Sequence, residues 1–135
     1  MKKGFTLIEL MVVVTIIAIL SSITMSRITF LVKKAKESAT KGNLSTLRAS
    51  VRIYYVDTVG VFPPSLSSLV SVRYLNEVPN VKLGKYHAET NAEYTGTVVD
   101  ESGGKGGYWF YDPQDGTVAV NCTHGDLNGV PISSW

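Results

Sequence analysis

Residues 5–25, FTLIELMVVVTIIAILSSITM, form a long apolar stretch near the start of the chain. A helix of this length rises about 30 Å, which matches the hydrocarbon thickness of a bilayer. The stretch nevertheless contains a carboxylate, Glu9, and no lysine or arginine that would neutralise it. An ionisable side chain inside a membrane-spanning segment is costly, so it is expected to have a partner or a function. We therefore predict a membrane anchor whose carboxylate finds its cation outside the segment.

The nearest possible cation is a main-chain amine at Phe5, which would exist if the chain were cut after Gly4. Glu9 lies four residues along the helix from that position, so its side chain points back toward its own N-terminus. An equivalent helix alongside, shifted along its axis, could offer its amine instead. Both alternatives remain open from the residues alone.

Residues 1–4, MKKG, form a short basic leader ahead of the apolar run. Two lysines in this position predict a cytoplasmic N-terminus, with the C-terminal part of the chain facing outward. The alternative is a secretory signal peptide, with the lysines as its basic region and residues 10–20 as its apolar core. We disfavour it because Ser21 and Ser22 are poor cleavage-site residues and the apolar pattern continues into a helix.

From Ser26 to about Asp57 there is no proline and one glycine, Gly42, which predicts a single helix of about 50 residues. At about 100° per residue, the apolar side chains before and after Gly42 cluster on faces rotated by roughly 130°. The first group is Ile28, Leu31, Ala35 and Ala39, and the second is Leu44, Leu47, Val51 and Tyr54. We predict that the lower half packs on neighbouring molecules or lipid, while the upper half covers the chain's own head.

Charge is unevenly distributed along a chain whose net charge is +2. Residues 27–57 hold seven basic and two acidic side chains, whereas residues 58–135 hold four basic and eight acidic ones. Packed copies of such a basic stem and acidic head would be electrostatically complementary, and an incidental surface bias is the alternative. One ribbon of the helix should face water or an acidic surface: Lys33, Lys34, Lys41, Arg48 and Arg52.

The remaining residues predict a small head. Gly60, Pro63 and Pro64 should end the long helix, residues 65–70 should form a short helix, and residues 80–91 are polar and irregular. The composition of residues 92–99, 107–111 and 117–121 is typical of strands, and DPQDG at 112–116 is typical of a turn. The predicted fold is α+β, a long N-terminal helix with a small antiparallel sheet on its upper half.

The aromatic run of the second predicted strand has two faces. Trp109 and Tyr111 point one way, and Tyr108 and Phe110 point the other, so one pair should meet the upper half of the helix. Stacking on nucleic acid is the disfavoured alternative, and we expect no nucleic-acid partner.

Few residues suggest catalysis. His124 and Asp126 lie two apart, but no placed nucleophile accompanies them, so we predict no catalytic residues and no enzyme. A membrane-tethered hydrolase using His124 is a disfavoured alternative. His87 is interpreted as a surface residue, and Cys122 as a small buried residue at a strand end. Since Cys122 is the only cysteine, it forms no intramolecular disulfide.

The C-terminal loops contain a candidate calcium site. Asp112, Asp115 and Asp126, with Asn121 and Asn128 nearby, supply the oxygen ligands that this ion prefers. The simpler interpretation is that they are turn residues, so we expect no metal site and no cofactor.

The run Gly4-Phe5-Thr6-Leu7-Ile8-Glu9 strongly resembles the processing site of type IV prepilins and of the pseudopilins of type II secretion systems. The resemblance implies cleavage between Gly4 and Phe5 by a prepilin peptidase on the cytoplasmic side, and N-methylation of Phe5. It also implies that Glu9 pairs with the terminal amine of a neighbouring subunit during assembly. Gly4 and Phe5 are then the processing residues, and Phe5 and Glu9 the assembly residues.

A weaker resemblance, to short pilins and major pseudopilins, covers residues 42–66 and 107–112. Many pilins close a C-terminal loop with a disulfide, which Cys122 alone does not allow. Many also have a proline where this chain has Ser26, so we do not expect the helix to melt locally there. The small, cysteine-poor head favours a secretion pseudopilin.

The expected function is that of a non-catalytic subunit of a type IV filament, either a type II secretion pseudopilus or a type IV pilus. The predicted domains are the prepilin leader (1–4), the transmembrane and assembly helix (5–25) and a pilin-like head that includes the upper half of the long helix (26–135). The subunit would reside in the bacterial inner membrane as a single-pass protein with a periplasmic head, and then enter a periplasmic pseudopilus or an extracellular pilus.

The partners that the resemblance implies are membrane lipid, the prepilin peptidase, an inner-membrane assembly platform with its ATPase, further copies in a helical homopolymer, and minor pilins or pseudopilins. The alternative from another class is a small secreted binding domain behind an ordinary signal peptide.

Overall fold

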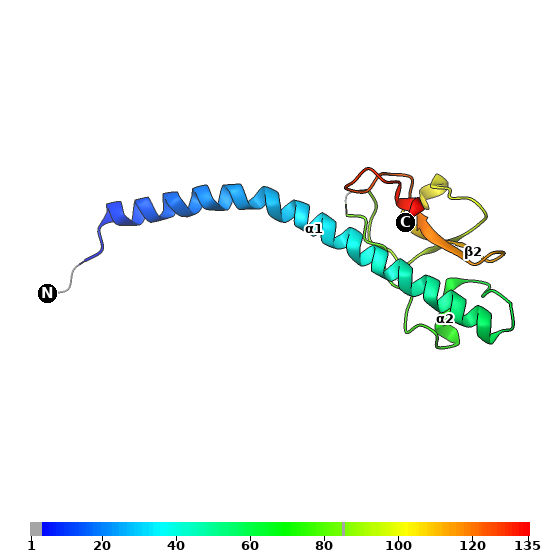
Figure 1. Ribbon diagram of the computed structural model, residues 1–135. Coiled ribbons are helices and arrows are strands. Elements are labelled where there is room, and N and C mark those ends of the chain that lie inside the picture. Colours follow the sequence, from blue (N-terminus) through cyan, green and yellow to red (C-terminus); the bar gives the residue numbers. More distant parts are fainter. Residues whose placement is uncertain (1–3, 85) are drawn as a thin grey trace. The chain divides into compact units, whose positions relative to one another are not determined.

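The computed structural model describes residues 4–84 and 86–135, and its elements are drawn in Figure 1. Helix α1 spans Leu7–Asp57, 51 residues, and runs through Ser26 without interruption. Gly60 adopts a φ of 94° and its N–H donates to the carbonyl of Tyr55 at 2.9 Å, which satisfies a C-terminal carbonyl of the helix. The predicted length and end of the long helix are therefore confirmed.

The chain divides into two compact units, residues 1–32 and 33–135, and α1 contributes to both. In the first unit the large apolar side chains of α1 are exposed, with fractions from 45% to 78%. The hydroxyls of Thr15 and Thr24 donate to the carbonyls of Met11 and Leu20, so neither hydroxyl is left without a partner on this apolar surface. Among the described residues, α1 is long and apolar enough to cross a membrane.

The upper half of α1 belongs to the core of the second unit. Leu44, Leu47 and Val51 are at most 2% exposed, whereas Ile28 and Leu31 are 49% and 59% exposed. The prediction that the upper half of the helix covers the chain's own head is therefore confirmed, and the packing of the lower half on neighbouring molecules or lipid stays a prediction. The core joins these residues to α2 (Leu66–Ser71), the following loop, the sheet and the C-terminal segment: Leu66, Leu69, Val81, Leu83, Trp109, Tyr111, Val118, Val120, Cys122 and Ile132.

The sheet has the order β1-β2-β3, formed by Glu93–Thr95, Tyr108–Asp112 and Thr117–Asn121. β2 and β3 form the expected antiparallel hairpin. β1, however, pairs with β2 in parallel, so the sheet is mixed and the prediction of a wholly antiparallel sheet was wrong. Parallel neighbours need a connection of about a dozen residues, and residues 96–107 supply it. β1 is also shorter than the predicted strand at 92–99.

This connection is fastened by Asn121, which is completely buried at the end of β3. Its Nδ2 donates to the carbonyls of Asp100 and Lys105 at 2.6 and 3.0 Å, and its Oδ1 accepts from the N–H of Asp100 at 2.8 Å. Satisfying a buried amide in this way fixes the crossover loop against the sheet.

Of the two aromatic pairs on β2, Trp109 and Tyr111 face the core, and both side chains are fully buried. The prediction that one pair would face the core is therefore confirmed. Trp109 Nε1 donates to the carbonyl of Pro79, and the Tyr111 hydroxyl donates to the carbonyl of Pro63, each at 2.6 Å. β2 therefore contributes to the core and also binds the two loops that contain Pro63 and Pro79. Phe110, on the opposite face, is only 5% exposed and lies near the ring of Tyr94.

The predicted basic ribbon is only partly correct, because two of its members bind the chain's own head. Lys41 Nζ lies 3.2 Å from the carboxylate of Asp126. Arg48 donates to the main-chain oxygens of Val118 at 3.0 Å and Trp135 at 2.6 Å. Part of the charge complementarity between stem and head is thus used within one chain. The C-terminal turn Ile132–Ser134, red in Figure 1, packs against β3, although the sequence showed no regular pattern there.

Candidate functional site

The N-terminal end of α1 is organised by a capping box between Thr6 and Glu9. Glu9 Oε2 accepts from the N–H of Thr6 at 2.9 Å and from its hydroxyl at 2.7 Å, while Thr6 Oγ1 faces the N–H of Glu9 at 3.3 Å. Such reciprocal bonds satisfy N–H groups that a helix start otherwise leaves unpaired. The Thr-x-x-Glu spacing of a capping box is visible in the sequence, although Glu9 was predicted as an assembly residue in need of a cation and its capping role was not predicted.

The two predicted processing residues lie directly before this cap. Gly4 and Phe5 are both exposed, Phe5 by 75%, and neither belongs to a helix or strand. A Cβ built on Gly4 would meet nothing within 4 Å. The packing of the chain therefore gives no reason for glycine at position 4.

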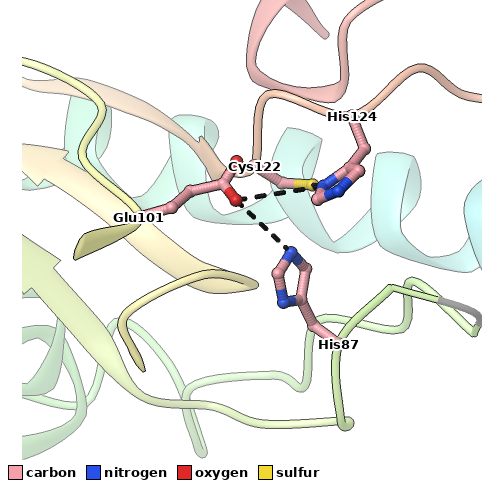
Figure 2. A group of neighbouring side chains, drawn as sticks. All are labelled: His87, Glu101, Cys122 and His124. Atoms are coloured by element: carbon pink, nitrogen blue, oxygen red, sulfur yellow. Dashed lines mark hydrogen bonds and ion pairs between the residues drawn. The ribbon is translucent and has the colours of Figure 1, made fainter. Parts of the chain in front are cut away.

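In the second unit, four metal-ligating side chains come together: His87, Glu101, Cys122 and His124. Figure 2 shows the carboxylate of Glu101 facing both His87 and the Cys122–His124 pair. Cys122 Sγ lies 3.4 Å from His124 Nδ1, and Glu101 Oε2 lies 3.8 Å from His87 Nε2 and 3.9 Å from His124 Nδ1. His87 is half-buried and not the surface residue that the sequence predicted.

The electrostatics of this cluster follow from burial and from a main-chain contact. Burial raises the pKa of the Cys122 thiol above its usual range, and the Glu101 carboxylate adds to the effect. Burial also raises the pKa of Glu101, but the hydrogen bonds from Thr123, followed by the two histidines, outweigh it, so that pKa lies below its usual value. The N–H of Thr123 donates to Glu101 Oε1, which fixes the orientation of the carboxylate. Cys122 is the buried strand-end residue that was predicted.

The structure separates His124 from Asp126, the pair noted in the sequence. The Asp126 carboxylate binds Lys41 Nζ and Trp135 Nε1, each at 3.2 Å, as well as two main-chain N–H groups of its own loop. His124 contacts Cys122 and Glu101 instead.

The candidate calcium ligands are divided between two loops and the end of β3. Asp112 and Asp115 accept from the N–H groups of Gln114 and Thr117, each at 2.8 Å, in the turn between β2 and β3. Asp126 closes the loop after His124, and Asn121 is used in the crossover connection. Each of these acids forms hydrogen bonds within its own turn.

The fold and the N-terminal geometry define a chain with an apolar, membrane-length helix that begins in a capped Gly-Phe-Thr segment and continues into a small α+β head. Residues 1–25 match the family model of the prokaryotic N-terminal methylation motif. This motif is the hallmark of prepilin-type proteins, the type IV pilins and pseudopilins, and it confirms the resemblance noted in the sequence. It is a structural motif that is not known as enzymatic.

No curated protein and no solved structure is significantly similar to the chain. The N-terminal methylation motif at residues 1–25 supports a membrane-anchored, type IV pilin-like filament subunit processed by a prepilin peptidase.

Proposed function

We propose that the chain is a structural subunit of a type II secretion pseudopilus, cleaved between Gly4 and Phe5 and polymerised through α1. The observation that carries the proposal is the position of Glu9, a carboxylate in the first turn of an exposed apolar helix directly after the processing motif. The subunit is stored in the inner membrane with its head in the periplasm and is then extracted into the filament.

The exposed surface of α1 supports polymerisation. Apolar side chains cover the helix from Leu7 to Val32, and none of the large ones is buried by the chain itself. Lipid covers this surface while the subunit is in the membrane. In a filament, neighbouring α1 helices take the place of the lipid. Because one apolar environment replaces another, close packing and polar pairing between helices supply the net gain.

Glu9 supplies that polar pairing. Among residues 4–84 and 86–135, no lysine, arginine or histidine forms an ion pair with Glu9, and its side chain bonds to Thr6. Both Thr6 bonds go to Oε2, so Oε1 is available to the amine that cleavage creates at Phe5. An amine from a neighbouring subunit neutralises both charges in the apolar interior and sets the axial register of two helices.

The choice of the secretion pseudopilus over a pilus rests on the head. Cys122 is buried and free, so the head lacks the C-terminal disulfide of many pilins. Deleting the chain from its host should trap secreted proteins in the periplasm and leave surface pili intact. Loss of pili with normal secretion would assign the chain to a pilus instead.

Processing is tested by the intact mass and N-terminal residue of the protein purified from membranes of its own host. We expect a chain that begins at N-methylated Phe5 and lacks residues 1–4. A soluble chain that begins near Ser22 would lack the anchor and Glu9, and would establish the secreted binding domain as the correct alternative.

Assembly is tested by comparing Glu9→Gln with Glu9→Ala. The amide of Glu9→Gln keeps an oxygen for the Thr6 cap but removes the charge, whereas Glu9→Ala removes both. We expect both variants to be inserted and cleaved, and both to be lost from filaments. Glu77→Gln, a charge removal on the exposed surface of the head, is the matched control and should assemble normally.

The two Glu9 variants distinguish the role of the Glu9 charge from the role of its hydrogen bonds to Thr6. Filaments of normal yield from Glu9→Gln, with none from Glu9→Ala, would show that Glu9 acts only through the cap at Thr6. Normal filaments from both would refute the assembly role.

A further inference from the structure

We propose that His87, Glu101, Cys122 and His124 form a structural zinc site that fastens the head. This inference is independent of the filament function, because it rests only on residues of the second unit. The site would join three segments: the loop before β1, the connection between β1 and β2, and the segment that follows β3.

The donor set is the one that zinc favours. Tetrahedral zinc sites combine cysteine sulfur, histidine nitrogen and carboxylate oxygen at about 2.0–2.3 Å from the metal, which places neighbouring donors about 3.3–3.8 Å apart. Three donor pairs here measure 3.4, 3.8 and 3.9 Å, and all four donor atoms lie within 4.8 Å of one another. A contraction of about 1 Å at the widest pair closes the tetrahedron.

The four donors converge on one point and do not form a catalytic relay. In a cysteine–histidine relay the thiol and the carboxylate lie at opposite nitrogens of the imidazole. Here Cys122 Sγ and Glu101 Oε2 both approach Nδ1 of His124. Cys122 is also fully buried, so no substrate reaches its sulfur. The geometry suits an ion at the centre and not attack on a substrate.

His87 provides a second, independent indication. Its Nε2 is a buried polar atom that has no hydrogen-bond partner among residues 4–84 and 86–135, and it faces the Glu101 carboxylate at 3.8 Å. Buried nitrogens of this kind normally have a partner, which a metal ion would supply.

Two glycines hold the His87 ring in place. A Cβ on Gly106 would lie 2.4 Å from His87 Cε1, and one on Gly107 would lie 2.5 Å from His87 Cβ. The backbone of residues 106–107 therefore approaches the imidazole as closely as only glycine allows. The ring of Tyr86 stacks on His124 at 4.3 Å between ring centroids, and the N–H of Thr123 orients the Glu101 carboxylate.

Binding balances charge within the site. Zinc displaces the proton of the Cys122 thiol to water, and one thiolate and one carboxylate then neutralise the ion, with two neutral imidazoles completing the set. The gain is a cross-link between distant segments in a head whose cysteine forms no disulfide.

The first experiment uses the full chain in detergent micelles, purified without a histidine tag, stripped with a chelator and passed through gel filtration after addition of zinc chloride. We expect about one zinc ion per chain and a higher thermal unfolding midpoint, which chelator reverses. Cobalt in place of zinc should produce a thiolate-to-metal charge-transfer band, which requires Cys122. Calcium should not raise the midpoint; a rise with calcium and none with zinc would overturn the proposal.

Three variants decide whether these residues hold the ion. Cys122→Ser should abolish the cobalt band. His87→Gln should lower zinc affinity by at least about 10–100-fold, and Gly106→Ala should do likewise by displacing the His87 ring. Glu89→Gln, an exposed acid paired with Lys36 outside the cluster, is the matched control and should bind as the parent chain does.

If Cys122→Ser fails to fold, His87→Gln and Gly106→Ala decide the matter, since both leave the buried thiol in place. No zinc retained by the parent chain, or equal affinity in the parent, His87→Gln and Gly106→Ala chains, would overturn the proposal.

Discussion

Replacing Leu47 with alanine tests the division of α1 into a core half and an exposed half. Leu47 is completely buried in the core of the head. Truncation of a buried leucine costs about 2–5 kcal/mol of unfolding free energy, because transfer energy is lost and a cavity remains. Total stability of a domain is about 5–15 kcal/mol, so Leu47→Ala removes a large share of it.

Leu31→Ala is the matched control on the same helix. Leu31 is 59% exposed, so the same three carbons are removed from a site that the head does not use. We expect its effect on unfolding of the head to stay within about 0.5 kcal/mol. For filament assembly we expect the larger direct effect from Leu31→Ala, which should weaken contacts between subunits. Leu47→Ala should lower filament yield only by lowering the amount of folded head.

The assay is thermal unfolding of the full chain in detergent micelles, followed by the fluorescence of Trp109 and Trp135, which both belong to the head. For a unit of the size of residues 33–135, a loss of about 3 kcal/mol lowers the midpoint by about 12–24 °C. Equal shifts of the unfolding midpoint in Leu31→Ala and Leu47→Ala would refute the proposed division of the helix. A Leu47→Ala chain with the same midpoint as the parent chain would refute it as well.

Further predictions concern single contacts in the head and are measured by urea unfolding. Tyr111→Phe leaves the carbonyl of Pro63 without its donor and should cost about 1–3 kcal/mol at neutral pH. Burial, followed by nearby carboxylates, raises the pKa of Tyr111, so the parent's stability should fall as pH rises above about 10, and Tyr111→Phe should flatten that decline. Gly116→Ala places a Cβ 2.3 Å from Phe62 at a φ of 73° and should cost about 1–3 kcal/mol; an unchanged midpoint would contradict the position of that ring. Gly42→Ala, in helix with open space around it, should add about 0.5–1 kcal/mol, and any loss would contradict the described surroundings of Gly42.

The long helix and the β2–β3 hairpin were predictable because each depends on contiguous residues. Absence of proline and the 3.6-residue period determine α1, and the turn at residues 112–116 determines the hairpin. The N-terminal motif is equally local, which is why it was recognised without the structure.

The parallel pairing of β1 and the cluster around His87 were not predictable in this way. Both depend on how residues 96–107 cross back over the sheet, and that path is fixed by the buried amide of Asn121, far along the chain from Asp100. Nothing local to His87 indicates that Glu101 and Cys122 will lie beside it. The Thr6–Glu9 cap, by contrast, has a local signal in its three-residue spacing, which the charge of Glu9 considered alone does not reveal.

The C-terminal residues Ile132 and Trp135 complete the head around α1, which has a consequence for biosynthesis. Val51 and its neighbours on the helix are made early, but the core that covers them includes Ile132, and Arg48 binds the main chain at Trp135. At about 5–20 residues per second, translation from position 51 to 132 takes about 4–16 s, during which this apolar face has no complete cover. Each nascent copy therefore passes through an interval in which this apolar face lacks its complete native cover, and a chain that ended before Ile132 would leave part of that cover missing.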